Sequence, residues 1–175
     1  MKTLYFMRHG LTEMNVAGKW SGRTETSLTQ EGRDQAKLAG KAAKDLSIDA
    51  IVCSTMGRAV ETAEIVAKEI GYPLDQIHKS SLLIERDFGS FEGTPWQPDL
   101  DLDGFADVES VDTLKNRAIL ALEWVESIPG DTILIVSHGA TGRMLRHVVD
   151  SSIPFKGASR FSNAEIHELK RTPEV

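Results

Sequence analysis

Short apolar segments alternate along this chain with segments that have the periodicity of helices. We expect strands at residues 2–7, 50–53, 82–84 and 133–136, because each is a short run dominated by apolar residues. Strands that are apolar on both faces belong in a sheet that helices cover on both sides. The alternation therefore predicts an α/β fold, namely a three-layer α/β/α sandwich with a mostly parallel central sheet.

Four helices are expected between and after these strands. The first begins after Thr29, whose side chain can cap it, and the second carries apolar residues at helical spacing over residues 59–70. Residues 71–73 include a glycine and a proline, which end the second helix. The third helix covers residues 114–125, and the fourth spans about residues 140–149.

The length and composition suit an ordinary globular protein, and we expect one domain over residues 1–175. The net charge of −6, with no long basic run, argues against nucleic acid or an anionic membrane as the main partner. No apolar stretch approaches the ~20 residues of a membrane-spanning helix. The first apolar run reaches Arg8 too early for a signal peptide. With Cys53 as the one cysteine, we expect a cytoplasmic protein.

Residues with catalytic potential follow all four expected strands. Arg8 and His9 follow the first strand, Arg58 starts the helix after the second, Glu85 follows the third and His138 the fourth. Because ligands bind beyond the carboxyl ends of parallel strands, we expect these five side chains to gather at one edge of the sheet. Any one of them alone would be an ordinary surface residue, but five at one edge indicate a functional site.

These side-chain types together favour chemistry on a phosphate group. Two guanidinium groups and the start of a helix can bind a phosphate dianion. An imidazole with one unprotonated nitrogen can attack phosphorus, and nearby arginines help to keep it neutral. A carboxylic acid can protonate the leaving oxygen, and the glycine after each histidine would let the backbone approach the anion. The set predicts phosphoryl transfer without a metal or other cofactor.

The sequence RHGLTEMN resembles the Arg-His-Gly-x-Thr-x-x-Asn signature of the histidine phosphatase superfamily, in its phosphoglycerate mutase-like branch. Each family motif is short, but seven in the correct order are highly specific. The resemblance implies the phosphoglycerate mutase-like fold over most of the chain. The six further matching segments are WSGRTETSLTQEGRDQA, STMGRAVETA, LIERDFGSFEG, Glu109-Ser110 with Arg117, VSHG and FSNAEI.

The resemblance also implies a role for each matching residue in the centre of the site. His9 would be the nucleophile that becomes phosphohistidine. Arg8, Arg58 and His138 would hold the phosphoryl oxygens. Glu85 would be the general acid, and then the base that activates water.

Three further residues would surround this centre. By the same resemblance, Asn15 would reach a phosphoryl oxygen, and Ser21 and Gly22 would line the mouth of the substrate pocket. Leu11 departs from the polar residue often found between the glycine and the threonine of the signature. This departure affects a peripheral contact rather than the central chemistry.

Acidic residues near the expected site offer two competing interpretations. Asp87 and Glu92 are rivals to Glu85 as proton donor, but Glu85 directly ends the apolar run. Residues 99–110 nearly match a calcium-binding loop, but position 12 is Ser110 instead of the required glutamate. We therefore expect a solvated acidic loop and no metal site.

The spacing of the motifs favours a phosphatase over a mutase. Mutases of the family carry a long basic insertion before the second histidine, whereas 44 residues separate Gly93 from His138 and residues 87–114 contain no Lys or Arg. The prediction is a phosphatase that hydrolyses small phosphate monoesters. A phosphoglycerate mutase-type phosphotransferase is the alternative, followed by a non-catalytic phospholigand-binding module. The loops at residues 19–27 and 94–110 would select the substrate, and the sequence leaves both the substrate and the oligomeric state open.

Overall fold

Five strands form one sheet in the computed structural model, which describes residues 2–98, 100–157 and 159–170. Their order is β3-β2-β4-β1-β5. The first four strands in this order pair in parallel, and β5 runs antiparallel to β1 at the edge. The predicted, mostly parallel sheet is confirmed. The strands are β1 (Thr3–Arg8), β2 (Ala50–Ser54), β3 (His78–Ser80), β4 (Thr132–Ser137) and β5 (Ile166–Glu168).

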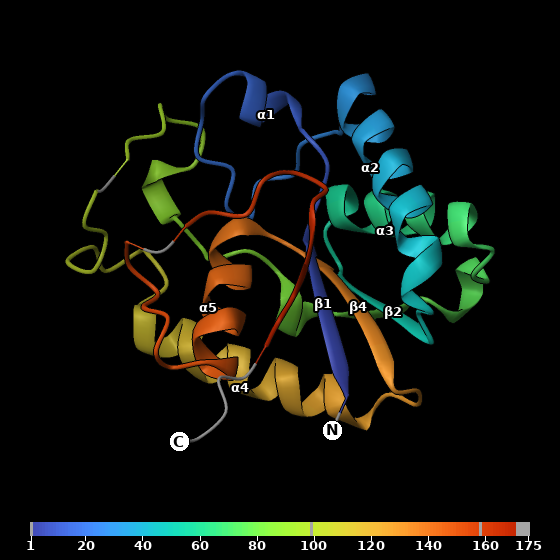
Figure 1. The fold of residues 1–175 in the computed structure, drawn as a ribbon. Coiled ribbons are helices and arrows are strands. Elements are labelled where there is room, and N and C mark those ends of the chain that lie inside the picture. The colour runs from blue at the N-terminus through green and yellow to red at the C-terminus, as the bar shows by residue number, and fades with distance from the viewer. Residues whose placement is uncertain (1, 99, 158, 171–175) are drawn as a thin grey trace.

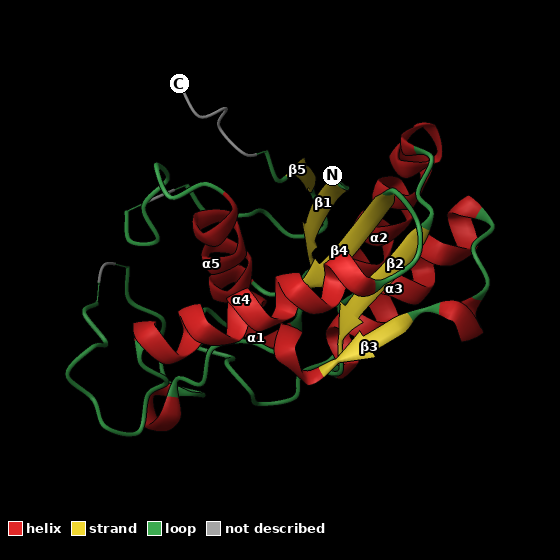
Figure 2. Cartoon of the chain, turned by 90° about the horizontal axis from the view of Figure 1, so that it is seen from below, coloured by secondary structure: helices red, strands yellow, loops and turns green. Residues whose placement is uncertain are grey.

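Helices cover both faces of this sheet (Figures 1 and 2). Alternate residues of β1, β2 and β4 pack against α2 and α3 on one face, and against α4 and α5 on the other. The three-layer prediction is confirmed. None of the helices in the described segments is long and apolar enough to cross a bilayer. The helices are α1 (Glu13–Val16), α2 (Gln30–Ala43), α3 (Gly57–Ile70), α4 (Val111–Ser127) and α5 (Gly139–Val149), and single 3₁₀ turns lie at Lys44–Leu46, Leu74–Gln76, Ser81–Leu83 and Gly89–Phe91.

The ends of the helices follow from local sequence. Thr29 caps α2, since its hydroxyl oxygen accepts a hydrogen bond from the Gly32 N–H at 2.9 Å. Gly71 ends α3 with a left-handed φ of 74°, a conformation that glycine adopts without steric cost. Both helices were predicted from these residues.

The expected strand at residues 82–84 is wrong. The chain there forms the 3₁₀ turn Ser81–Leu83, and β3 lies just before it, beside β2. The Ser80 hydroxyl accepts a hydrogen bond from the Leu82 N–H at 3.2 Å and so starts the turn. Leu83 is wholly buried. The apolar run therefore indicates burial, but a run of three residues is too short to distinguish a buried turn from a buried strand.

Candidate active site

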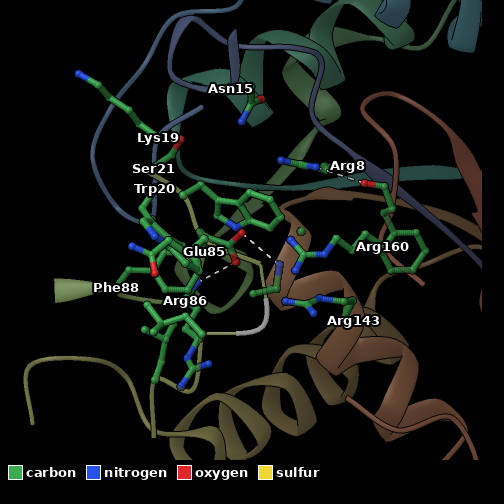
Figure 3. Close-up of a pocket in the computed structure, with 18 of the residues that line it drawn as sticks. Arg8, Asn15, Lys19, Trp20, Ser21, Glu85, Arg86, Phe88, Arg143 and Arg160 are labelled. Atoms are coloured by element: carbon green, nitrogen blue, oxygen red, sulfur yellow. Dashed lines mark hydrogen bonds between the residues drawn. The ribbon is translucent and has the colours of Figure 1, made fainter. Parts of the chain in front are cut away.

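A pocket of about 1000 Å³ opens at the carboxyl ends of β1, β2 and β4. Arg8, His9, Arg58 and Glu85 line it (Figure 3 shows Arg8 and Glu85). His138 is wholly buried, and its ring centroid lies 5.3 Å from that of His9. The fold thus brings together the five side chains that follow the expected strands, although Glu85 follows a 3₁₀ turn instead of a strand.

The His9 ring is held in one tautomer. Its Nδ1 atom lies 2.7 Å from the Gly10 carbonyl oxygen, and because a carbonyl only accepts, Nδ1 carries the proton. Nε2 then bears the lone pair and accepts a hydrogen bond from Arg58 Nε at 3.3 Å. The His9 backbone is fixed as well, since its N–H donates to Ser137 and its carbonyl accepts from Asn163. Nε2 is therefore the nitrogen that is available as a nucleophile.

The surroundings of both histidines disfavour a positive charge. Burial lowers the pKa of His9 well below its usual value, and His138, Arg8 and Arg58 lower it further. Burial likewise lowers the pKa of His138, followed by Arg58, Arg8 and Arg117. His9 is thus neutral at pH 7, as a nucleophile must be.

His138 has one buried nitrogen that still needs a partner. Its Nε2 lies 2.8 Å from the Ser54 hydroxyl, which already accepts from the Met56 N–H at 3.2 Å. The hydroxyl proton of Ser54 is therefore free to be donated to Nε2, which leaves the proton of the ring on Nδ1. Within the described structure Nδ1 is buried without a hydrogen bond. Such a donor suits an anionic oxygen.

The two arginines in this centre differ in the donors that they leave free. Arg58 donates to the carbonyl oxygens of Gly22 and Thr24 at 2.6 and 2.9 Å, and its Nε donates to His9. Its guanidinium is thereby held beside the His9 ring. Arg8 donates to the Phe161 carbonyl at 3.2 Å, but its Nε is buried without a partner among the described residues. Arg8 is the arginine with a free buried donor for an anion.

Glu85 is held as a carboxylate at the start of α5. Its oxygens accept from the N–H groups of Arg86, Ala140 and Thr141 at 2.8 to 3.1 Å. Burial raises its pKa, but these three N–H groups and the charge of Arg58 together outweigh burial, and the net shift is downward. A general acid must carry a proton, so Glu85 has to gain one when an anionic substrate enters beside it.

Arg117, which is ion-paired with Glu109, stabilises the turn that precedes Glu85. Arg117 on α4 forms a bidentate pair with Glu109, at 2.8 and 2.9 Å. The same guanidinium donates to the carbonyl oxygens of Leu82 and Ile84, at 2.9 and 2.7 Å. Residues 81–85 follow β3 and do not pair with another strand. The bonds from Arg117 therefore fix the backbone near Glu85, where hydrogen bonds to a neighbouring strand would otherwise do so.

The two ends of the segment after Glu85 are hydrogen-bonded to each other. Arg86 Nε donates to the Glu109 carbonyl at 2.8 Å, and the Glu109 N–H donates to the Asp87 carbonyl at 2.9 Å. These bonds close residues 87–109 into a loop with a fixed base.

Asn15, Ser21 and Gly22 all line the pocket. The Asn15 side-chain oxygen accepts from the Thr12 N–H and from Asn163, which leaves its amide N–H groups for a ligand. The Ser21 hydroxyl is buried without a partner among the described residues. The Gly22 carbonyl instead serves to position Arg58.

The glycines after the two histidines pack against protein. A side chain on Gly10 would collide with the backbone of Gly32 in α2, and one on Gly139 would lie 3.6 Å from Arg8 Nε. Gly10 is therefore needed for helix packing. The expectation that both glycines serve the approach of an anion has no support at Gly10.

The rival carboxylates do not line the pocket in the described structure. Glu92 accepts hydrogen bonds from the N–H groups of Arg23 and Phe88, and Asp87 forms an ion pair with Arg23 at 3.6 Å. Both serve the loop structure around the site. Glu85 is therefore the better placed of the three acids.

The acidic loop is neutralised by protein cations. Asp101 and Asp103 pair with Lys156, and Asp103 also pairs with Arg86. Asp99, the first position of the calcium-like sequence, lies outside the described residues. Within the described part of the chain, no group of three or more His, Cys, Asp or Glu side chains could hold a metal ion.

Sequence reasoning missed Arg143 and Arg160, which line the pocket wall. Trp20 and Trp96 also line it, and they lie in the two loops that were expected to select the substrate. Arg143 follows His138 within two turns of α5. Helix geometry could therefore have predicted that Arg143 lies near the site. Arg160 lies in an irregular segment, and no periodic signal pointed to it.

The buried histidines predict a loss of stability in acid. In the unfolded chain a histidine has a pKa of ~6.5, whereas both site histidines hold theirs well below this value. As the pH falls below ~6.5 the unfolded state binds more protons, so the free energy of unfolding must fall. Urea unfolding at pH 7.5 and pH 5 measures this change. We expect His138→Gln to show a smaller change than the wild type, and the control His78→Gln to match the wild type. An unchanged pH dependence in His138→Gln would contradict the assignment.

The chain is similar to known proteins in both sequence and fold. The model of the histidine phosphatase superfamily (branch 1) matches residues 4–175. An uncharacterized phosphatase, PhoE, of Bacillus subtilis is 30% identical over 99% of this chain and 91% of its own length. A probable phosphoglycerate mutase, GpmB, of Photorhabdus laumondii is 35% identical over 79% of this chain and 70% of its own. The solved structure of YhfR from Bacillus stearothermophilus superimposes with a TM-score of 0.83 at 27% identity, covering 96% of this chain and 90% of that one. The chain belongs to the histidine phosphatase superfamily, in branch 1.

Proposed function

We propose that this protein is a phosphatase that hydrolyses small phosphate monoesters through a phosphohistidine on His9, without a metal or other cofactor. The observation that carries the proposal is the state of the His9 ring. Nδ1 donates to the Gly10 carbonyl, the ring is neutral, and His9 lines a pocket in which Arg8 Nε and His138 Nδ1 are buried without a partner among the described residues.

In the first step His9 attacks the phosphorus of the ester. The bond between Nε2 and phosphorus forms while the bond between phosphorus and the ester oxygen breaks. Arg8, Arg58 and His138 stabilise the charge on the phosphoryl oxygens. Glu85 gives its proton to the leaving alkoxide oxygen, so that a neutral alcohol departs.

In the second step water replaces the alcohol. Glu85, now a carboxylate, takes a proton from water as the water oxygen bonds to phosphorus. The bond between phosphorus and Nε2 then breaks, which regenerates neutral His9 and releases inorganic phosphate. The three backbone N–H groups that donate hydrogen bonds to Glu85 favour this carboxylate form.

Mutase-type phosphotransfer is the second candidate. A relative that is 35% identical is described as a probable phosphoglycerate mutase. The pocket also carries Arg143 and Arg160, although residues 87–114 lack basic residues. A mutase returns the phosphoryl group to an organic acceptor, whereas a phosphatase gives it to water. A non-catalytic phospholigand-binding module would do neither.

Release of inorganic phosphate from a panel of phosphate monoesters tests the proposal. We expect turnover with at least one aliphatic ester, and the same kcat/KM after excess chelator is added. A rearranged phosphate ester formed faster than free phosphate would favour the mutase. Binding without turnover across the panel would favour the binding module. Loss of activity on chelation, with recovery on adding calcium or magnesium, would contradict the metal-free mechanism.

A further inference from the structure

Two arginines in the pocket wall carry charge that no described carboxylate neutralises. Arg143 lies on α5 and Arg160 in the segment that follows it, and both line the pocket. Figure 3 shows both side chains entering from the α5 side, with Trp20 and Phe88 across the pocket. Neither arginine forms an ion pair within the described part of the chain.

Apart from Lys19, which lines the pocket without a side-chain partner among the described residues, the other cations of the pocket already have a partner or a role. Asp101 and Asp103 neutralise Lys156, and Asp103 also pairs with Arg86. Arg8 and Arg58 surround His9. Arg143 and Arg160 therefore give the pocket positive charge that lies outside the proposed phosphoryl-binding centre and is not neutralised by a described carboxylate.

Aromatic rings hold the two guanidinium groups in place without neutralising them. The Arg143 guanidinium lies over the Phe155 ring, 5.1 Å from its centroid, and that of Arg160 lies over Trp96 at 4.3 Å. Neither guanidinium has a hydrogen bond to a described residue. Their N–H donors are thus both positioned and free.

The two charges also act on each other. Burial lowers the pKa of Arg143, and Arg160 lowers it further, against a raising effect from Glu85. Burial lowers the pKa of Arg8 as well, Glu85 raises it, and Arg160 lowers it further. An anion placed between these arginines would relieve this repulsion.

Aromatic side chains form the pocket wall opposite the arginines. Trp20 packs against Phe88, with ring centroids 4.7 Å apart, and lies 6.2 Å from Trp96. Trp20 Nε1 is buried without a partner among the described residues. This surface suits a small organic group that joins two anionic ends.

We propose that Arg143 and Arg160 form a second oxyanion site, which binds a carboxylate or phosphate of the substrate while its esterified phosphate lies at His9. The term substrate rests on the proposed function. The preferred substrates are thus phosphate monoesters with a second anionic group. The lack of basic residues at 87–114 does not exclude them, because the charge comes from residues 143 and 160.

The test compares two non-hydrolysable ligands of equal shape, 4-carboxybenzylphosphonate and 4-carbamoylbenzylphosphonate, by titration calorimetry at fixed ionic strength. One charge distinguishes them, and charge-assisted hydrogen bonds to it should make the carboxylate bind about 10-fold tighter or more. Arg160→Gln and Arg143→Gln should bring this ratio toward one. Lys37→Gln, which removes a charge on α2 away from the pocket, should retain the wild-type ratio.

The outcomes separate a ligand site from an indirect role. If the arginines act only on Glu85 or on the phosphonate, their replacement would weaken both ligands equally and overturn the proposal. Equal affinities in the wild type, or no binding of either ligand, would also overturn it. Arg160 is exposed, so Arg160→Gln should fold even if Arg143→Gln does not. Phosphate release from 4-carbamoylbenzyl phosphate tests the proposed function separately, because the binding ratio does not depend on turnover.

Discussion

Replacement of His9 by glutamine is expected to abolish both turnover and the covalent phosphoenzyme. Glutamine is polar and of similar length, but its amide has no basic nitrogen that can attack phosphorus. Because Nε2 is the atom to which phosphorus must bond, no partial function should remain at this position. We expect phosphate release to fall by about 10⁴-fold or more, the scale seen when a nucleophile is removed.

Rapid quenching after mixing with a ³²P-labelled aryl phosphate measures the intermediate. Wild-type protein should carry label that is stable in base and lost in acid, as phosphohistidine is, and His9→Gln should carry none. His78→Gln is the matched control, since His78 lies on β3 and does not line the pocket. Label that persists in His9→Gln would assign the nucleophile to another residue.

Glu85→Gln should slow hydrolysis most for esters with poor leaving groups. Removal of a general acid typically costs ~10²–10⁴ in rate, and the loss should fall on kcat. An alkyl phosphate needs protonation of its leaving oxygen, whereas 4-nitrophenyl phosphate needs little. The loss should therefore be large for the alkyl ester and much smaller for the nitrophenyl ester.

Steady-state kinetics of both esters with two variants measures this difference. Glu92→Gln is the matched comparison, because Glu92 is the rival carboxylate that lies outside the pocket lining. It should show no dependence on the leaving group. If Glu85→Gln slows both esters equally and Glu92→Gln shows the dependence, then Glu92 is the proton donor.

The arrangement of the catalytic centre was open to prediction because it depends on strands. Arg8 is the last residue of β1 and His9 directly follows it, whereas His138 directly follows β4, and these strands are paired in parallel. Parallel pairing alone places such residues at one edge. The capped helices were equally accessible, since Thr29 and Gly71 give local signals.

The pocket wall was not open to prediction in the same way. Trp20 and Arg160 lie in irregular segments, and their positions depend on long-range contacts such as that between Arg160 and Trp96. The count of charges along residues 87–114 did not show that Lys156 and Arg86 pair with Asp101 and Asp103. Spacing in sequence does not report which charges meet in space.

Residues 87–109 form a loop with a closed base, and backbone hydrogen bonds also join this loop to Gly18 and Trp20. Its two ends are tied to each other through Arg86, Asp87 and Glu109, and Glu109 is in turn tied to Arg117 on α4. The position of Glu85 is therefore decided outside the loop. We expect insertions, deletions and exchanges between residues 90 and 107 to reshape the mouth of the pocket while Glu85, the proposed proton donor, stays in place. Substrate range and catalytic chemistry can thus diverge independently in proteins built on this plan.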